Sequence, residues 1–344
     1  MTGNSSGRAV TMADVARTAG VSRAAVSFVL NERSDISIPD TTRERVLASA
    51  AQLGYRRNAA ARALASQRSG LFGLVTEIVT SPFAADIITG AQRRTWEDER
   101  FLLIAPSEDD EAMESVAIEK LLEQRVEGVI IAASWHQAIR VPENAHQIPC
   151  VLVHCYDESG QLPSIVPDEE SGGRAAAREL LAAGHREIGH LTLPLGIPAQ
   201  VGRLRGFADE LSAASVPLPD RRIVAGDGTA ESGYRGAAEL LDGPNPPTAL
   251  FCGNDRMAMG AYDAVKERGL RIPHEISIIG FDDQQALADS LRPGLTTVAL
   301  PFEEMGAAGV RKLTELTAGS QKTSSHLALD CPLRQRSSVG FALH

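Results

Sequence analysis

The chain has 344 residues, carries a net charge of −10, and is 43% hydrophobic and 23% charged. This length is too great for one ordinary hydrophobic core, so two or three domains are expected, and the balance of residue types excludes a largely disordered chain. The apolar runs are too short for a transmembrane helix, and the polar start of the chain lacks the apolar core of a signal peptide. We therefore expect a cytoplasmic protein without a membrane partner.

The charge is distributed unevenly along the chain. Residues 1–70 contain ten Arg, no Lys and five acidic residues, a net charge of +5, which leaves −15 on the remainder. A basic head on an acidic body is typical of a DNA-binding module joined to a second domain. No metal-binding spacing connects the cysteines, and no cofactor is expected. Buried thiols are predicted for Cys150, Cys155, Cys252 and Cys331.

Three short helices are predicted in residues 1–56, the first domain. Thr11 caps the first helix and Gly20 stops it, Ser22 caps a second helix that Asn31 ends, and the third occupies residues 39–54. The inward-facing residues predicted from the helical spacing are Met12, Val15, Ala16, Ala19, Ala25, Val26, Val29, Leu30, Val46, Leu47, Ala50 and Leu53.

The first two predicted helices have the pattern of a helix-turn-helix motif. Small Ala16 lets two helices cross closely, Gly20 makes the turn, Val21 fills the angle and Val26 anchors the second helix. The second helix would present its N-terminal face to a major groove, where Arg23 can donate two hydrogen bonds to a guanine edge. A plain three-helix bundle is the alternative interpretation, and the spacing, the charge and the linker that follows favour DNA binding. The pattern predicts base-reading positions at Ser22, Arg23 and Ala24, and phosphate contacts from Ser27, Asn31 and Thr42.

Residues 57–70 are predicted to be a hinge helix and linker. Residues 56–66 are rich in alanine and favour helix, but an isolated helix this short is poorly stable in water. We therefore expect a linker that folds conditionally.

Residues 71–344 alternate between apolar runs and amphipathic helical stretches. Such an alternation predicts a doubly wound parallel sheet, and its length is sufficient for two lobes. The predicted strands are 71–75, 101–105, 128–132, 150–153, 188–193, 249–252 and 276–281, and the clearest helices are 84–96, 112–124, 173–182 and 257–266.

The order of head, hinge and body resembles the lactose-repressor/galactose-repressor (LacI/GalR) family from about Val10 to Gly340. The resemblance implies a homodimer that binds a palindromic operator in double-stranded DNA and inserts a leucine, here Leu64, into the minor groove. Two departures are the Ala25-Val26-Ser27-Phe28 segment, where the family commonly has Thr-Val-Ser-Arg, and Arg57, where the hinge often has Pro. With these matches included, the predicted DNA-contacting residues are Thr11, Ser22, Arg23, Ala24, Ser27, Asn31, Thr42, Tyr55, Asn58, Ala61, Arg62 and Leu64.

The body resembles the two-lobed periplasmic sugar-binding proteins (type I), which implies a bound small molecule, here a sugar-like effector. Ligands of open parallel sheets lie at the carboxyl ends of the strands. Alternatives stay open for three of the predicted residues: Phe83 could be core, Trp135 could pack a lobe and Asp168 could be a helix cap. The predicted effector-binding residues are Phe83, Ser134, Trp135, Asp168, Arg203, Asn254 and Asp282.

The sequence disfavours two other classes of protein. A transport binding protein is disfavoured by the basic head and by the absence of a signal peptide. An enzyme is disfavoured because the sequence shows no nucleophile elbow, P-loop, dinucleotide-binding glycine pattern or HExxH motif. The sequence therefore predicts a transcriptional regulator, a repressor, under allosteric control.

Overall fold

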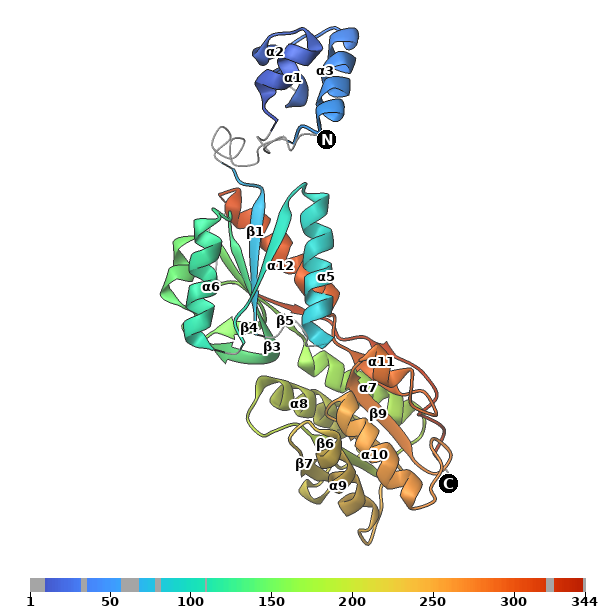
Figure 1. Ribbon diagram of the computed structural model, residues 1–344. Coiled ribbons are helices and arrows are strands. Elements are labelled where there is room, and N and C mark those ends of the chain that lie inside the picture. The colour runs from blue at the N-terminus through green and yellow to red at the C-terminus, as the bar shows by residue number, and fades with distance from the viewer. Residues whose placement is uncertain are drawn as a thin grey trace, which may run out of the picture. The chain divides into compact units, whose positions relative to one another are not determined.

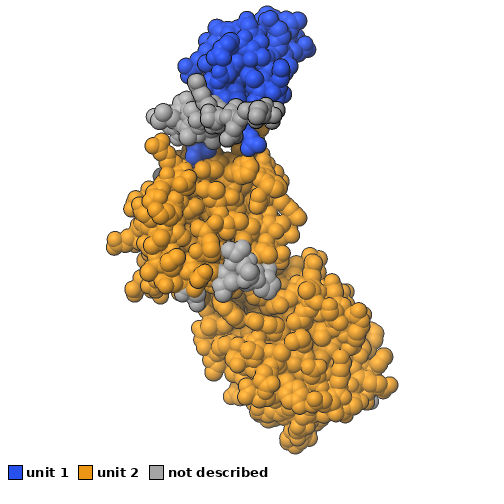
Figure 2. All heavy atoms as spheres, in the orientation of Figure 1, with its two compact units in different colours: residues 1–69 blue, residues 70–344 orange. Residues whose placement is uncertain are grey.

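The computed structural model describes residues 10–31, 36–56, 68–77, 82–108, 110–319 and 325–342. The chain divides into two compact units, residues 1–69 and residues 70–344, which are coloured separately in Figure 2. Residues 57–67 of the predicted hinge and linker lie outside the described residues, and with them the predicted contacts Asn58, Ala61, Arg62 and Leu64.

The first unit contains three helices, α1 (Met12–Ala19), α2 (Arg23–Leu30) and α3 (Asp40–Leu53), as Figure 1 shows. Thr11 and Asp14 form a capping box at α1, in which each side chain accepts a hydrogen bond from the other residue's backbone N–H. Gly20 then ends α1 in the left-handed conformation, with φ at 67°, which glycine adopts without strain. The Ser22 hydroxyl accepts from the N–H of Ala25 and caps α2. Both predicted caps, Thr11 and Ser22, are confirmed.

The core of this unit is small, and most of the residues that the helical spacing predicted to face inward pack in it or against it. Val15, Val26 and Val46 are fully buried at its centre. The prediction for Leu47 is wrong, because 48% of its surface is exposed. Helix α3 buries Val46, Ser49 and Ala50 and packs the partly buried Leu53 on the same face, and residue 47 lies about 100° from residue 46 on the helix. Ser49 is buried on that face instead.

The second unit consists of two lobes, each a parallel sheet covered by helices on both faces. The first sheet has the order β11-β5-β4-β3-β1-β2, with α5 and α12 on one face and α6 on the other (Figure 1). Its elements are β1 (Leu71–Thr76), α5 (Pro82–Glu97), β2 (Phe101–Pro106), α6 (Glu111–Glu123), β3 (Val129–Ile139), η1 (Glu143–Gln147), β4 (Cys150–Asp157), β5 (Ser164–Pro167), α12 (Phe302–Thr317) and β11 (His326–Leu329).

The second sheet has the order β12-β10-β9-β8-β6-β7, and within it only β12 is described as antiparallel to its neighbour. Helices α7 and α8 pack together, as do α9 and α10. The elements are α7 (Glu169–Ala182), β6 (Ile188–Thr192), α8 (Pro198–Ala213), η2 (Asp220–Arg222), β7 (Ile223–Ala225), α9 (Ala230–Leu241), β8 (Ala249–Cys252), α10 (Asp255–Glu267), β9 (Ser277–Asp282), α11 (Gln285–Ala288), β10 (Thr296–Ala299) and β12 (Leu333–Arg334).

The chain passes between the lobes between β5 and α7, between β10 and α12, and between β11 and β12. In both sheets the strand order reverses beside the first strand, β1 or β6, which is where open parallel sheets bind ligands. The predicted fold, a helical head with a two-lobed parallel-sheet body, is confirmed. The four cysteines are buried free thiols, as predicted. None of the helices in the described part of the chain is long and apolar enough to span a membrane.

One strand differs from its prediction in a way that affects the site. Strand β3 extends well beyond the predicted segment 128–132, and its pairing with β4 shifts register between Ala132 and Gln137. Ser134 and Trp135 therefore lie within an irregular stretch of a strand and not beyond its end. Such irregularities bend a strand and redirect its side chains.

Candidate functional site

The N-terminal turn of α2 is the exposed face of the first unit that the helix-turn-helix pattern singled out. Ser22, Arg23 and Ala24 are exposed, while Val26 and Val29 of the same helix are buried in the core. The Arg23 side chain thus projects from the positive end of a helix, on a rigid support. A helix presented in this way can enter a major groove.

The other predicted DNA contacts in this unit have local partners. Asn31 donates from Nδ2 to the Ser27 hydroxyl over 3.2 Å, and Arg45 donates to the Thr42 hydroxyl over 3.5 Å. The Thr11 hydroxyl belongs to the cap of α1, and Tyr55 packs against the core. Thr11 and Tyr55 therefore have structural roles already, and their contacts with DNA stay predictions.

A small cavity lies between the lobes of the second unit. Only about 20 Å³ of it is accessible to the centre of a water molecule, enough for one or two waters. It brings together six of the predicted effector residues, and its lining consists of Phe83, Ser134, Trp135, His136, His154, Leu193, Ala199, Arg203, Asn254, Arg256, Asp282, Leu300 and Phe302. Because this space is too small for a sugar, a ligand of that size requires the lobes to separate.

Asp168 is the predicted effector residue that does not line this cavity. Its carboxylate accepts a hydrogen bond from the N–H of Ser171 over 2.9 Å and caps α7. This position fits the helix-cap alternative that the sequence left open. The next residue, Glu169, is the one that reaches the buried polar cluster.

A buried ion cluster forms the floor of the site. Arg203 donates from Nε to Glu169 over 2.8 Å, and its Nη1 lies 3.4 Å from Asp282 Oδ1 and also donates to the carbonyl of Gly253. The guanidinium carbon lies 3.7 Å above the centre of the Phe281 ring. The second Glu169 carboxylate oxygen lies 3.2 Å from His136 Nδ1, and this contact joins the two lobes.

The cluster shifts the pKa values of its carboxyl groups in opposite directions. Burial alone would raise the pKa of Glu169, but Arg203 and His136 together lower it to about 2. For Asp282 burial prevails over the attraction of Arg203 and raises the pKa to about 6. Glu169 is thus the permanent anion that pairs with Arg203.

Asn254 and Ser134 differ in whether their side-chain polar atoms already have hydrogen-bond partners. Asn254 caps α10 by accepting from Met257 N over 2.8 Å and donates to the carbonyl of Gly228 over 3.0 Å, so its amide is occupied at both ends. In contrast, the Ser134 hydroxyl and Arg256 Nε are buried and have no hydrogen-bond partner among the described residues. Buried polar atoms of this kind normally have a partner, which a ligand or water can supply.

Aromatic side chains form the opposite wall. Phe83 stacks on Phe302 with ring centres 4.8 Å apart, and the His154 ring meets Phe302 edge-on at 5.2 Å. Trp135 reaches toward the other lobe, where a Cβ built on Gly228 would lie 3.6 Å from its ring. This is an ordinary contact distance, and what favours glycine at position 228 is its φ of 82°.

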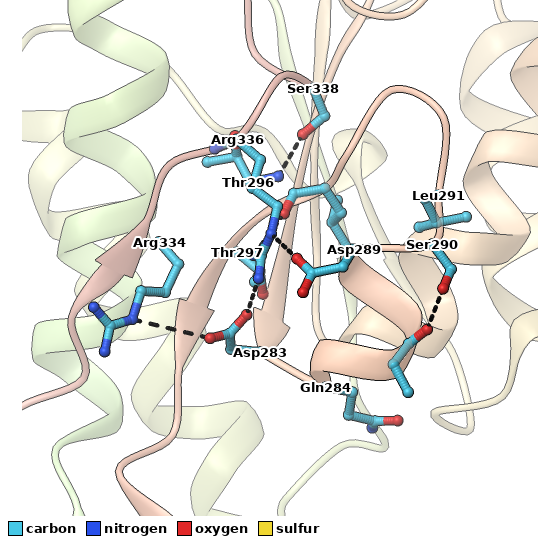
Figure 3. Close-up of polar contacts among 12 residues, drawn as sticks. Asp283, Gln284, Asp289, Ser290, Leu291, Thr296, Thr297, Arg334, Arg336 and Ser338 are labelled. Atoms are coloured by element: carbon cyan, nitrogen blue, oxygen red, sulfur yellow. Dashed lines mark hydrogen bonds and ion pairs between the residues drawn. The ribbon is translucent and has the colours of Figure 1, made fainter.

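The loop that carries Asp282 is held in an unusual backbone conformation. Asp282 and Asp283 have φ values of 114° and 55°, which non-glycine residues rarely adopt. Figure 3 shows how the C-terminal segment holds this loop: Arg336 contacts Asp283 at 2.8 Å and Asp289 at 2.6 Å, and Arg334 lies 3.9 Å from Asp283. These contacts position the carboxylate of Asp282 at the cavity.

Sequence reasoning missed five polar or aromatic residues of the site: His136, His154, Glu169, Arg256 and Phe302. His136 and Glu169 each follow a predicted residue directly, which is the signal that could have identified them. Phe302 begins α12, after the chain has returned to the first lobe, and no local pattern reveals that return.

Replacing His154 with Asn is expected to make stability less dependent on pH. Burial lowers the pKa of His154 from its ordinary value of 6.5 to about 4. A depressed histidine pKa has no effect on stability above pH 6.5, and it lowers the free energy of unfolding as the pH falls from 6.5 toward 4, because the unfolded state takes up the proton first. Asparagine tolerates the φ of 60° at this position and does not titrate.

The measurement is the midpoint of urea unfolding between pH 7 and pH 4.5. His154→Asn should show a flatter curve than the unmodified chain, and His146→Asn, at an exposed histidine, should not. Curves of equal slope for the two variants would contradict the buried neutral state of His154.

Comparisons with known proteins agree in both parts of the chain. A model of the bacterial regulatory proteins of the lacI family matches residues 11–58, and a model of periplasmic binding protein-like domains matches residues 177–339. The chain is 32% identical over 332 residues to the transcriptional repressor PurR of Klebsiella pneumoniae (strain 342), which covers 96% of both proteins. It is also 32% identical over 327 residues to the ribose operon repressor of Haemophilus influenzae, covering 94% of this chain and 98% of that protein.

Solved structures give the same result for the fold. The lac repressor dimer bound to operator and the anti-inducer ONPF superposes with a TM-score of 0.79 at 30% identity, over 97% of this chain and 100% of that one. The complex of the regulator CelR with cellobiose superposes with a TM-score of 0.65 at 28% identity, over 96% and 99% of the two chains.

Proposed function

The chain belongs to the LacI family of transcriptional repressors, and on that premise we propose that it binds a palindromic operator as a homodimer under the control of a sugar-like effector. The observation that carries the proposal is the exposed N-terminal turn of α2. It presents Arg23 from a helix whose opposite face is locked into the core. A rigid support of this kind gives a base-reading side chain a defined position.

The cavity between the lobes supports control by an effector. It combines a buried guanidinium, a carboxylate and aromatic rings, which suit the hydroxyl groups and the apolar face of a sugar. Because the closed cavity has room for about two waters at most, a ligand must select a different arrangement of the lobes. We propose that this change in lobe arrangement is what the hinge transmits to the DNA.

An exposed apolar surface around the edge strand β2 supports the homodimer. A large exposed apolar patch beside an unpaired edge strand is typical of a surface that another chain covers. The exposed residues are Trp96 at the end of α5, Phe101 and Ile104 on β2, and Met113 and Val116 on α6.

The proposal is tested by a gel shift with the DNA upstream of the gene for this chain. The full chain should retard that DNA, and a version without residues 1–69 should not. Addition of the effector found in a thermal-shift screen of sugars should change the retardation. Equal retardation by both versions would contradict DNA binding through the first unit.

Replacing Arg23 with alanine is expected to weaken binding to the operator by ~1–3 kcal/mol and to relax preference at one position in each half-site. The reason is the loss of a bidentate contact with one base. The matched control is Arg17→Ala, because Arg17 is an exposed arginine paired with Asp14 on α1. Fluorescence anisotropy measures the affinity of both variants for operator DNA and for random DNA. Equal losses on the two DNAs would make Arg23 a phosphate contact.

A further inference from the structure

We propose that the effector is an uncharged polyhydroxyl compound, and that Glu169 excludes phosphorylated sugars and other anions by neutralising Arg203. The inference rests on the proposed function, in which the cavity between the lobes is the effector site. The effector is thereby limited to uncharged compounds, and Glu169, which does not line the cavity, becomes the residue that selects against anions.

An anionic ligand would need a cation to bind, and Arg203 is not free to serve as one. Arg203 is buried, and its guanidinium already contacts two carboxylates, those of Glu169 and Asp282, and the carbonyl of Gly253. One face of its plane is covered by Phe281. A phosphate that approached Arg203 would have to displace one of these carboxylates or lie beside it, and repulsion between anions is strong where water is excluded.

The charges around the cavity also disfavour an anion. Two carboxylates, Glu169 and Asp282, face the arginines Arg203 and Arg256, and burial keeps His154 neutral at physiological pH. A guanidinium that already lies beside a carboxylate compensates the lost hydration of a second anion less than a free guanidinium does. A neutral ligand avoids this cost.

The surface that adjoins the cavity also disfavours anions. A groove of about 730 Å³ shares Phe83, Asp282, Leu300 and Phe302 with the cavity. Its basic lining residue is Arg334, whereas its acidic ones are Asp86, Asp282, Asp283, Glu303 and Glu304. The field of this groove also disfavours anions.

A neutral ligand would find both polar and apolar contacts in the cavity. The buried Ser134 hydroxyl and Arg256 Nε lack partners among the described residues, and both border the cavity. Hydroxyl groups can satisfy both, as acceptors toward Nε and in either role toward Ser134. The rings of Phe302 and Trp135 offer apolar surface for the face of a sugar ring.

The test uses thermal melting of the full chain at constant ionic strength, with inorganic phosphate, glucose 6-phosphate and ribose 5-phosphate as anionic probes and the two free sugars beside them. The unmodified chain should show no saturable rise in melting temperature with any anionic probe. Glu169→Gln, which keeps the shape and removes the charge, should gain a saturable rise with phosphate of a few degrees, corresponding to at least about tenfold tighter binding.

The matched control is Glu170→Gln. Glu170 is the next residue of α7, but it pairs with Arg174 and Arg205, each at 3.1 Å, and does not contact Arg203. This variant should remain insensitive to phosphate. Glu169→Asn serves as the second variant if glutamine is not accommodated.

Saturable binding of phosphate or a sugar phosphate to the unmodified chain, lost in Arg203→Met, would overturn the proposal. Insensitivity of folded Glu169→Gln to all anionic probes would overturn the role of Glu169. Failure of the proposed function has a different signature: no ligand would alter operator retardation, whatever the anion measurements show.

Discussion

Arg203→Ala is expected to lower the free energy of unfolding by ~3–5 kcal/mol, because it leaves two buried carboxylates without their cation. Glu169 and Asp282 are both almost fully buried, and Arg203 is the cation that touches both. The same substitution should abolish the response of operator binding to the effector. Urea unfolding and operator anisotropy with and without effector measure the two effects.

Two comparisons separate the buried cluster from an ordinary ion pair. Arg178→Ala removes an exposed arginine paired with Glu210 and should cost at most about 1 kcal/mol. Arg203→Met combined with Glu169→Gln and Asp282→Asn should recover much of the lost stability, since no buried charge remains. A single Arg203→Ala variant no less stable than Arg178→Ala would contradict the cluster, and an unchanged effector response would remove Arg203 from the site.

Gly90→Ala is expected to destabilise the first lobe by at least about 3 kcal/mol or to prevent its folding, because the added methyl group has no space. Helices α5 and α12 cross at this glycine, and a Cβ there would overlap the backbone carbonyl of Glu303. The contact is reciprocal, because a Cβ on Gly306 would overlap the carbonyl of Ile87. Backbone atoms cannot move aside as a flexible side chain can, so the two helices would have to separate.

The matched control is Gly243→Ala. At Gly243 the nearest atom to a built Cβ is 3.4 Å away, an ordinary contact, and φ is not positive. The midpoint of urea unfolding compares the two variants. Equal midpoints would mean that α5 and α12 are not held at this distance in solution.

The first unit shows which features of the fold local sequence patterns can predict. Its capping residues Thr11 and Ser22 act on backbone groups three residues away, so sequence spacing alone predicts them. The burial of Val15, Val26 and Val46 follows from helical periodicity in the same way. Leu47 was misassigned because neighbouring apolar residues leave the facing side ambiguous, and packing against the other two helices decides it.

The alternation of strands and helices in the body likewise predicted parallel sheets, and the rule on strand ends predicted that Phe83, Ser134, Arg203, Asn254 and Asp282 would meet. The residues at which strands end were harder to predict from the sequence. The extension and register shift of β3 depend on its neighbours in the sheet, which the segment itself does not reveal.

Sequence by itself therefore determined the helix-turn-helix head, the two-lobed body and the edge of each sheet at which polar residues gather, since these follow from short-range periodicity and chain order. Only the tertiary structure decided which of two adjacent acidic residues caps a helix and which enters the buried cluster. Asp168 and Glu169 differ by one position at the start of α7, and the direction of that helix sends Glu169 to Arg203 and His136. Glu169, Arg203 and His136 come from α7, α8 and β3, so their meeting depends on how these elements pack in space and leaves no local trace in the chain.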